Sequence, residues 1–161
     1  MTQHPDVHRK QWLEQLVKDN DFTLGAELGV HEGVTHFYLL DRCPKLTMIG
    51  VDRYQGNQEK YWKGISPKLE EKGIRSIFYR MPTVEAATYV GTGELDFVFI
   101  DADHRYKSVL ADINAWKSKV RKGGYITGHD CDLPDVKRAL KEVFGEDGYK
   151  TAQDEVWYVQ V

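Results

Sequence analysis

The sequence predicts an α/β protein with a mainly parallel sheet and helices on both faces of that sheet. Three observations support this fold class. Short apolar runs alternate with amphipathic helical patterns along the chain, acidic residues stand at the ends of several apolar runs, and two glycines closely follow the first run. The carboxyl ends of parallel strands meet at one edge of a sheet, where ligands bind. We therefore expect these acidic residues to gather around one crevice.

The first half of the chain supplies helix, strand, helix and strand in turn. Apolar residues recur at helical spacing in 9–18, a short apolar run follows at 24–28, and a second helical pattern covers 34–41. The next apolar run, 46–51, comes after a loop marked by a proline. From Gln55 to Gly73, glycines and a proline are mixed with aromatic and charged residues. We expect a short helix inside a mobile connection there, because glycine and proline interrupt regular structure.

The second half continues the alternation to the end of the chain. Short apolar runs predict strands, and apolar residues at helical spacing predict the helices between them, in the order 76–79 (strand), 83–90 (helix), 95–100 (strand), 106–120 (helix), 125–128 (strand) and 134–144 (helix). Gly123 and Gly124 are expected to end the longest of these helices, and a proline opens the last one. The alternating tail 149–161 predicts a terminal hairpin strand.

Composition limits the classes of protein that this chain can represent. Its 161 residues fit a single domain, 1–161, with a hydrophobic fraction of 41% and a charged fraction of 29%. The net charge of −3 gives no general attraction to nucleic acid or to acidic membranes. The two cysteines have no metal-binding spacing, and no run approaches membrane-spanning length. We expect a cytoplasmic protein without a nucleic-acid or membrane partner, and composition leaves its oligomeric state open.

The segment 23–33 carries the most functional information. An apolar strand ends there in Glu27, and Gly29 and Gly33 follow at the turn into the next helix, as in a nucleotide-type site. A pyrophosphate binder disfavours an acid at this point and needs a second glycine where His31 stands. The expected ligand therefore carries a cation. S-adenosylmethionine meets this requirement, because it joins a nucleoside to an ammonium and a sulfonium group.

The end of the second predicted strand supports the same ligand. Asp52 follows that strand directly, and Arg53 comes next. A carboxylate at this place in a βαβ unit accepts hydrogen bonds from the two ribose hydroxyls of a nucleotide. We expect Asp52 to hold the ribose and Arg53 to line the same region.

Two later blocks complete a recognisable pattern. The strand 95–100 is followed by Asp-x-Asp-His-x-Tyr, and a later segment reads Gly-Gly-x-x-x-x-His-Asp; their residues are Asp101, Asp103, His104, Tyr106, Gly123, Gly124, His129 and Asp130. With these motifs in this order, the chain resembles the class I S-adenosylmethionine-dependent methyltransferases, in their small-molecule, O-methyltransferase-like branch. The resemblance covers about 24–161. It implies a Rossmann-like sheet of seven strands, one of them antiparallel, and S-adenosylmethionine as cofactor.

The resemblance also implies which residues contact the cofactor: Glu27, Gly29, Gly33, Asp52, Arg53, Met81 and Asp101. One departure concerns Arg80-Met81-Pro82-Thr83, where relatives often carry a Gly-Asp pair near the adenine. Because Pro82 has no N–H to donate, the adenine contacts are the part of the site that the resemblance defines least.

Asp101, His104, His129 and Asp130 form the expected chemical centre, and alternatives stay open for it. Without a metal, Asp101 would hold the cofactor's amino group, while His104 or His129 removes the proton of the acceptor hydroxyl. With a metal, Asp101 and Asp130 would bind Mg²⁺. In catechol-type relatives that use a metal, a lysine base occupies the position of His104. The simplest alternative is that the histidines only hydrogen-bond loop backbone.

We expect the function to be methyl transfer to a hydroxyl of a small polar molecule, with an amine as the second choice of acceptor. Tyr61 and Trp62 lie in the irregular segment 55–73 and could form a lid over this acceptor. Two other functions compete with this one: a non-catalytic module that binds S-adenosylmethionine, and an RNA or protein methyltransferase. The latter would normally show a basic face or an added domain.

Overall fold

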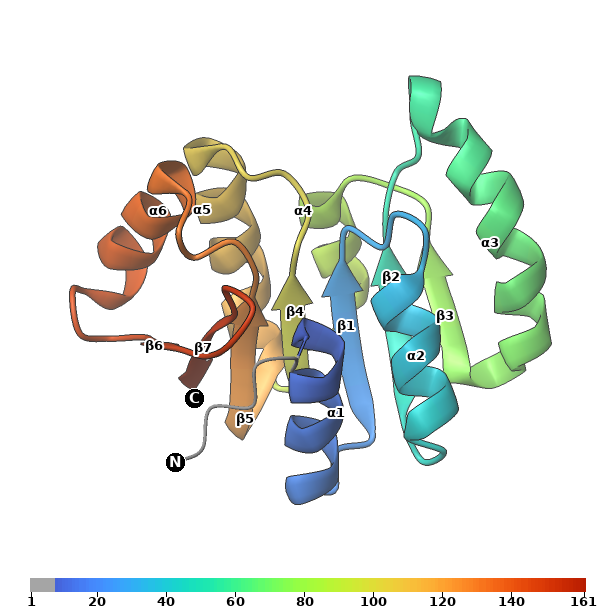
Figure 1. Cartoon of the computed structure of the whole chain (residues 1–161), viewed down its shortest axis with the longest axis horizontal. Coiled ribbons are helices and arrows are strands. Elements are labelled where there is room, and N and C mark those ends of the chain that lie inside the picture. Colours follow the sequence, from blue (N-terminus) through green and yellow to red (C-terminus); the bar gives the residue numbers. More distant parts are fainter. Residues whose placement is uncertain (1–7) are drawn as a thin grey trace.

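A computed structural model describes residues 8–161 of the chain and contains one seven-stranded sheet. The strand order is β3-β2-β1-β4-β5-β7-β6 (Figure 1). In chain order the strands are β1 (Leu24–Leu28), β2 (Thr47–Val51), β3 (Ser76–Tyr79), β4 (Leu95–Ile100), β5 (Val120–Gly128), β6 (Lys150–Thr151) and β7 (Trp157–Gln160). Neighbours among β1 to β5 pair in parallel, and β7 is antiparallel to both β5 and β6. The predicted fold class is confirmed.

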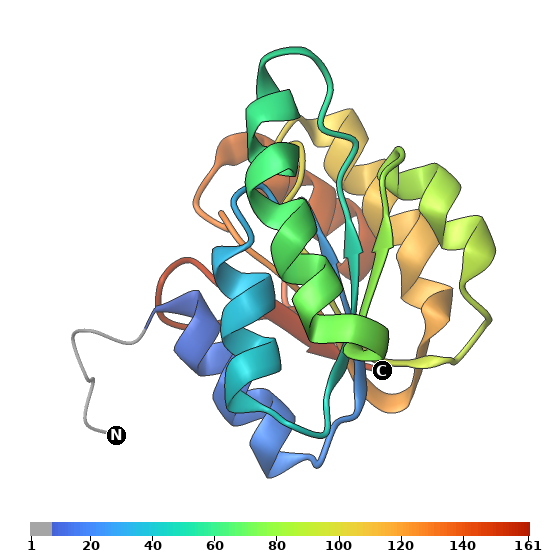
Figure 2. The same cartoon turned by 90° about the vertical axis from the view of Figure 1, so that its right-hand side faces the viewer.

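Helices cover both faces of this sheet (Figure 2). They are α1 (Arg9–Asp19), α2 (Val34–Arg42), α3 (Glu59–Lys72), α4 (Thr83–Ala86), α5 (Tyr106–Trp116) and α6 (Pro134–Phe144). Alternate residues of β4 enter different cores, because successive side chains of a strand point to opposite faces. Phe97 and Phe99 pack with α1 and α2, whereas Val98 and Ile100 pack with α4, α5 and α6. The sheet therefore lies between two apolar layers.

Two tryptophans, Trp116 and Trp157, are buried in the apolar core. Trp116 ends α5 with 0% of its surface exposed, and Trp157 on β7 is 1% exposed. The indole N–H of Trp116 donates to the backbone carbonyl of Thr83, at 2.9 Å. No helix within residues 8–161 is long and apolar enough to cross a membrane.

The segment from Gln55 to Gly73 differs from its prediction. A 3₁₀ turn at Gly56–Gln58 leads into α3, a regular helix of 14 residues that contains Pro67. Ile65 and Leu69, one helical turn apart, are buried in a cluster with Tyr54 and the partly buried Phe78. This packing keeps the segment helical, because burial of an apolar face outweighs the backbone cost of one glycine and one exposed proline.

The helix predicted at 106–120 is also shorter than expected. It ends at Trp116, a 3₁₀ turn covers Lys117–Lys119, and β5 already begins at Val120. Gly123 and Gly124 therefore lie inside a strand. A Cβ on Gly124 would stand 2.3 Å from the backbone oxygen of Asp96, so glycine permits the close approach of β5 to β4.

The helix predicted at 83–90 is nearly as expected. It consists of α4, which covers Thr83–Ala86, followed by a 3₁₀ turn over Ala87–Tyr89. The short α4 begins directly after the loop that leaves β3, so its first residues lie at the same edge of the sheet as the ends of β1, β2 and β4.

Candidate active site

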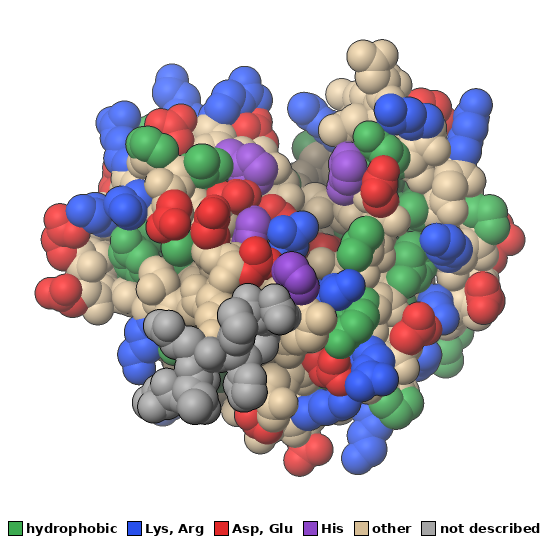
Figure 3. Space-filling view, in the orientation of Figure 1, with side chains coloured by type: hydrophobic (Ala, Val, Ile, Leu, Met, Phe, Trp, Pro, Cys, Tyr) green, Lys and Arg blue, Asp and Glu red, His purple; other side chains and the backbone are tan. Residues whose placement is uncertain are grey.

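A cavity of about 840 Å³ opens at the carboxyl ends of the central parallel strands. Figure 3 shows the surface hollowed between two raised parts of the molecule, with acidic and histidine side chains at the edge of the hollow. Its lining comes from the loops after β1, β2, β3 and β4, from the first residue of α1 and from one face of α5. This is the edge of the sheet at which the sequence placed its acids.

Glu27 lies at the floor of this cavity and is 3% exposed. Its Oε2 stands 3.5 Å from Nδ1 of the fully buried His36, but neither atom has a hydrogen-bond partner among the described residues. Burial raises the pKa of Glu27. A buried carboxylate oxygen without a donor is costly, so the site fits a ligand that brings a cation or N–H donors.

The loop after Glu27 depends on backbone conformations that favour glycine. Gly29 has φ +86°, and a Cβ there would stand 2.2 Å from the backbone oxygen of Asp101. Gly33 has φ +76° and precedes the first residue of α2; it is buried and lies outside the cavity lining. His31, also at positive φ, is exposed and lines the cavity. The loops after β1 and β4 thus approach closely beneath the cavity.

Asp52 is held in place by backbone groups. Its two carboxylate oxygens accept hydrogen bonds from the N–H groups of His31, at 3.0 Å, and Tyr54, at 3.1 Å. Each oxygen has a second lone pair, so the carboxylate can still accept two hydroxyl groups from the cavity. Arg53 is exposed and lines the cavity beside it, whereas Tyr54 is buried and donates from its hydroxyl to the carbonyl of His31.

Asp101, His104 and Asp130 meet where β4 and β5 end. Nε2 of His104 lies 2.8 Å from Oδ2 of Asp130 and 3.6 Å from Oδ1 of Asp101. The neighbouring carboxylates, first that of Asp101 and then those of Asp130 and Asp103, raise the pKa of His104 against the opposing effect of its partial burial. One ligand atom from each of Asp101, His104 and Asp130 lies within 4.8 Å of the others, close enough to hold a metal ion.

His129 is near this group, but both of its ring nitrogens face protein atoms. Nη1 of Arg9 lies 3.3 Å from Nε2, and Oδ1 of Asp130 lies 3.2 Å from Nδ1. Because a guanidinium can only donate, Nε2 of His129 must accept, which assigns the ring proton to Nδ1. His129 and Asp130 are not among the described residues that line the cavity, whereas Arg9, Asp101 and His104 are.

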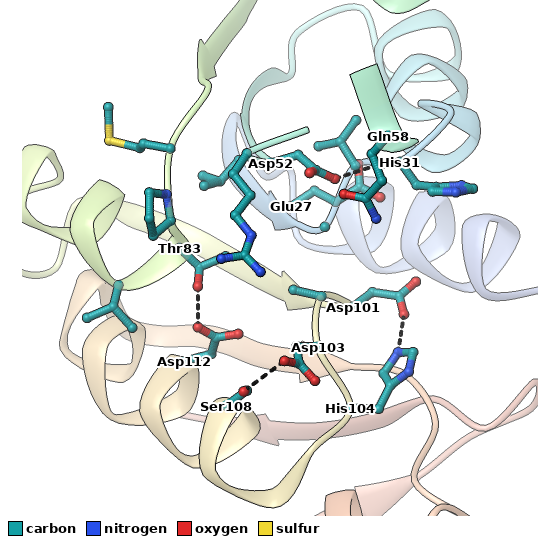
Figure 4. Close-up of a pocket in the computed structure, with 18 of the residues that line it drawn as sticks. Glu27, His31, Asp52, Gln58, Thr83, Asp101, Asp103, His104, Ser108 and Asp112 are labelled. Atoms are coloured by element: carbon teal, nitrogen blue, oxygen red, sulfur yellow. Dashed lines mark hydrogen bonds and ion pairs between the residues drawn. The ribbon is translucent and has the colours of Figure 1, made fainter. Parts of the chain in front are cut away.

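The opposite end of the cavity contains acids that the sequence analysis did not select. Asp112 on α5 is 3% exposed and accepts a hydrogen bond from the Thr83 hydroxyl. Asp103 is bound by Arg105 and by Ser108, and its hydrogen bonds to Arg105 lower the pKa of Asp103. Figure 4 shows the Thr83–Asp112 pair on one side of the cavity and His104 on the other. The sequence did contain one signal that could have identified Asp112 as a site residue. Asp112 lies three residues after Val109, so an acid stands on the apolar face of its helix.

Met81, which the sequence assigned to the cofactor, lines the cavity at this same end, together with Pro82 and Val84. The structure therefore brings Glu27, Gly29, Asp52, Arg53, Met81 and Asp101 around one space. Their individual roles toward a ligand stay predictions.

Comparisons with known proteins agree with this arrangement. A family model described as "Methyltransferase domain" matches residues 26–131, more than half of the chain. An uncharacterized protein of Acanthamoeba polyphaga mimivirus is 28% identical over 154 residues, which are 90% of this chain and 69% of that protein. Among solved structures, one from Staphylococcus aureus, provisionally named a caffeoyl-CoA O-methyltransferase, has a TM-score of 0.73 at 15% identity, covering 96% of this chain and 83% of that one.

A second solved structure is that of a TDP-rhamnose 3'-O-methyltransferase of calicheamicin biosynthesis. It has a TM-score of 0.66 at 17% identity and covers 95% of this chain and 80% of that one. At these identities the likeness of the structures shows a shared fold, while the family model identifies the kind of protein. The chain therefore belongs to the methyltransferase domain family, and it is an S-adenosylmethionine-dependent methyltransferase.

Proposed function

We propose that this protein transfers the methyl group of S-adenosylmethionine to a hydroxyl of a small polar molecule. The observation that carries the proposal is the position of His104, which lines the cavity with its side chain 47% exposed and lies against two carboxylates. Methyl transfer to a hydroxyl requires removal of one proton from the acceptor, a task for which an imidazole is suited.

The donor set of the cavity fits the cofactor. Glu27 offers a buried oxygen without a donor, and Asp101 lines the same part of the cavity. These two carboxylates would bind the cofactor's ammonium group, while Asp52 would accept both ribose hydroxyls. When bound, S-adenosylmethionine supplies an electrophilic methyl group on a positively charged sulfur. The negative side chains keep that end of the site favourable for a cation.

His104 would act as the general base. Its Nε2 lies against Asp130, so a proton on Nε2 is held there and Nδ1 is left to accept the acceptor's proton. The carboxylates of Asp130 and Asp101 would stabilise the imidazolium that forms. We assign His129 a supporting place, since Arg9 and Asp130 already contact its two nitrogens.

Space for a small acceptor exists beside His104. This residue also lines an adjacent depression of about 510 Å³, together with Arg105, Leu133 and Pro134. A small polar molecule could place its hydroxyl near His104 from that side. The two structural neighbours described above, which are named as O-methyltransferases, support a hydroxyl over an amine as acceptor.

A second version of the same reaction includes Mg²⁺. Oxygen atoms of Asp101 and Asp130, with a nitrogen of His104, lie close enough to bind an ion. The two carboxylates suit Mg²⁺, whereas the imidazole suits a softer metal. A bound ion would lower the pKa of an acceptor hydroxyl near His104.

The test begins with calorimetric titration of the purified protein with S-adenosylhomocysteine. A methyl-release screen over hydroxylated sugars and phenols follows, with small amines, a structured RNA and a basic peptide as comparison acceptors. Each reaction is run with chelator and with added Mg²⁺. We expect cofactor-product binding and turnover on a small hydroxylated acceptor. Binding without turnover on any acceptor would favour the non-catalytic module, and turnover only on RNA or peptide would replace the proposed substrate class.

A further inference from the structure

The carboxyl group of Asp112 has one oxygen that no other described residue contacts through a hydrogen bond or an ion pair, so this oxygen can bind a ligand. One oxygen, Oδ1, accepts a hydrogen bond from the hydroxyl of Thr83. No hydrogen bond or ion pair within residues 8–161 involves the second oxygen, although Asp112 is 3% exposed and lines the cavity. This oxygen is not among the described fully enclosed polar atoms that lack a partner, so it reaches the cavity, and its position on an apolar helix face asks for an explanation.

Neighbouring charges do not supply that explanation. Asp103, the acid nearest to it in the cavity wall, is bound by Arg105 and raises the pKa of Asp112 through its own charge. Burial is the larger cause, and together they raise the pKa of Asp112 to about 6. Within residues 8–161, Thr83 of α4 is the only residue that forms a hydrogen bond with the carboxyl group of Asp112. No described cation forms an ion pair with that carboxyl group.

The side chains around Asp112 would suit a ligand group that is flat and mostly apolar. Met81, Pro82 and Val84 line this end of the cavity from the loop after β3, and Ala111 lines it from α5. A heterocycle held between these side chains would reach Asp112 with its edge. The group presented at that edge must be a hydrogen-bond donor, because an ionised carboxylate only accepts.

The cofactor has one donor left for this position. Given the proposed function, its ammonium group lies at Glu27 and Asp101, and its diol lies at Asp52. The exocyclic amine of the adenine is the remaining N–H donor. Figure 4 shows Asp112 with Thr83 across the cavity from His104, with Asp52 on a third side, so the base would extend away from the acceptor end.

We propose that Asp112 accepts a hydrogen bond from the exocyclic amine of the cofactor's adenine, and that the Thr83 hydroxyl orients the carboxyl for it. Asp112 thereby supplies from α5 the acidic contact that the loop Arg80 to Thr83 lacks. This inference rests on the proposed placement of S-adenosylmethionine, and it assigns Asp112 as the residue that distinguishes adenine from other bases.

Calorimetry with two ligands tests the proposal: S-adenosylhomocysteine and S-inosylhomocysteine, in which a carbonyl replaces the amine. Wild-type protein should bind the adenosyl compound at least tenfold more tightly. In Asp112→Asn, Thr83 can still donate to the amide oxygen, which turns the NH₂ group toward the cavity. That variant should lose the tenfold preference or reverse it, because the amide can donate to the inosyl carbonyl.

Two further variants separate a direct contact from a general effect. Asp103→Asn removes a neighbouring charge of the same cavity and should keep the wild-type preference. Thr83→Val leaves the carboxyl in place without its hydroxyl partner and should reduce the preference by less than Asp112→Asn does. If Asp112→Asn does not fold, the ratio of the wild-type affinities for the two ligands still tests the proposal.

Each outcome bears on a different statement. Equal binding of the two ligands by the wild type, or an unchanged ratio in folded Asp112→Asn, overturns the proposal for Asp112 alone. Absence of any binding to the wild type overturns the cofactor placement and this inference with it. Selective adenosyl binding without turnover on a hydroxyl leaves this inference standing and rejects the proposed acceptor.

Discussion

The two ends of the cavity hold their acids in different ways. At the cofactor end, Glu27, Asp52 and Asp112 each make few contacts, and those are with backbone N–H groups, one hydroxyl or a distant histidine. At the acceptor end, Asp130 lies against His104 and His129, and Asp101, which also borders the cofactor end, lies beside His104 and Arg9. The first set has unused acceptor capacity, whereas the second set is largely compensated internally.

This difference indicates a division of work. Acids with free lone pairs that form no ion pair with a described lysine or arginine favour a ligand that brings positive charge and several N–H or O–H donors. Acids paired with imidazole hold a proton in a defined place and stabilise the charged ring. The cofactor end is therefore suited to binding, and the acceptor end to proton transfer. Substitutions at the two ends should consequently change different measured quantities.

The largest expected effect belongs to the acceptor end. His104→Ala should slow methyl transfer by roughly two to four orders of magnitude, because the general base is lost. The affinity for S-adenosylhomocysteine should stay close to that of the wild type. Single-turnover kinetics and calorimetry measure the two quantities. His31→Asn serves as a control at the cavity edge, since asparagine tolerates positive φ, and it should retain most activity.

Chelator and added Mg²⁺ decide between the two versions of that step. Turnover that disappears with chelator and returns with Mg²⁺ would assign Asp101 and Asp130 to an ion. Activity that survives both the chelator and the loss of His104 contradicts both versions. It would instead point to His129 as base, or to an amine acceptor that needs no deprotonation.

A smaller effect is expected at the cofactor end. Asp52→Ala should weaken binding of S-adenosylhomocysteine by about 1.5–3 kcal/mol, since charge-assisted hydrogen bonds to the diol are lost. Calorimetry gives this value. Asp147→Ala removes the same charge from an exposed position outside the cavity and is the matched control. If both variants bind like the wild type, Asp52 does not hold the ribose and the contrast between the two ends loses its main support.

Asp112→Asn should also stabilise the ligand-free protein at pH 8. Burial raises the pKa of Asp112 from 3.8 to about 6, so the folded state disfavours the charged form. Wild-type stability consequently falls as the pH rises through about 4 to 6, and asparagine does not titrate. The gain should be about 1–3 kcal/mol above pH 6 and vanish below pH 4. Urea unfolding across this pH range measures it.

Asp103→Asn provides the opposite sign in the same experiment. Its carboxylate is bound by Arg105, and that hydrogen bond lowers the pKa of Asp103 in the folded protein. The charge of Asp103 therefore stabilises the fold above the unfolded pKa, and this variant should be less stable than the wild type at pH 8. A gain in stability for Asp103→Asn would mean that loss of negative charge stabilises this cavity wall in general, with no special position for Asp112.

The smallest expected effect concerns α3. Residues 56–62 should exchange their amide hydrogens roughly tenfold faster than residues 65–72 in the ligand-free protein, because Ile65 and Leu69 anchor only the second part. Acceptor binding should slow exchange in 56–62, where Gln58 lines the cavity. Uniformly slow exchange along the helix without ligand would rule out a lid, and hydrogen exchange read by mass spectrometry distinguishes the two results.

Strand ends were predictable because they depend on local pattern. The bounds of β1, β3 and β4 match the apolar runs 24–28, 76–79 and 95–100, and Glu27 and Asp101 stand at or directly after such runs. Alternation of strand and helix fixes which edge of the sheet these acids share. The sequence therefore determined the fold class, the edge that carries the site and several of the residues that line it.

Local signals failed where a distant contact decided the structure. Glycine and proline in 55–73 indicated an irregular segment, yet packing of Ile65 and Leu69 on residues after β2 and in β3 keeps α3 helical. Gly123 and Gly124 read as a helix stop, but pairing with β4 and close approach to Asp96 place them inside β5. Their conformation follows from neighbours far away in the sequence.

The sequence alone determined that this chain forms an α/β fold with acids at its strand ends, because strands, turns and their terminal residues are specified by local composition. The resemblance of its motifs added the methyltransferase family. Only the tertiary structure brought Arg9 to His129, placed Asp130 against His104, and turned Asp112 of α5 toward Thr83 and the cavity. Those contacts join residues 26 to 120 positions apart. No local pattern encodes them, since they exist only when helices from both faces have packed on the sheet.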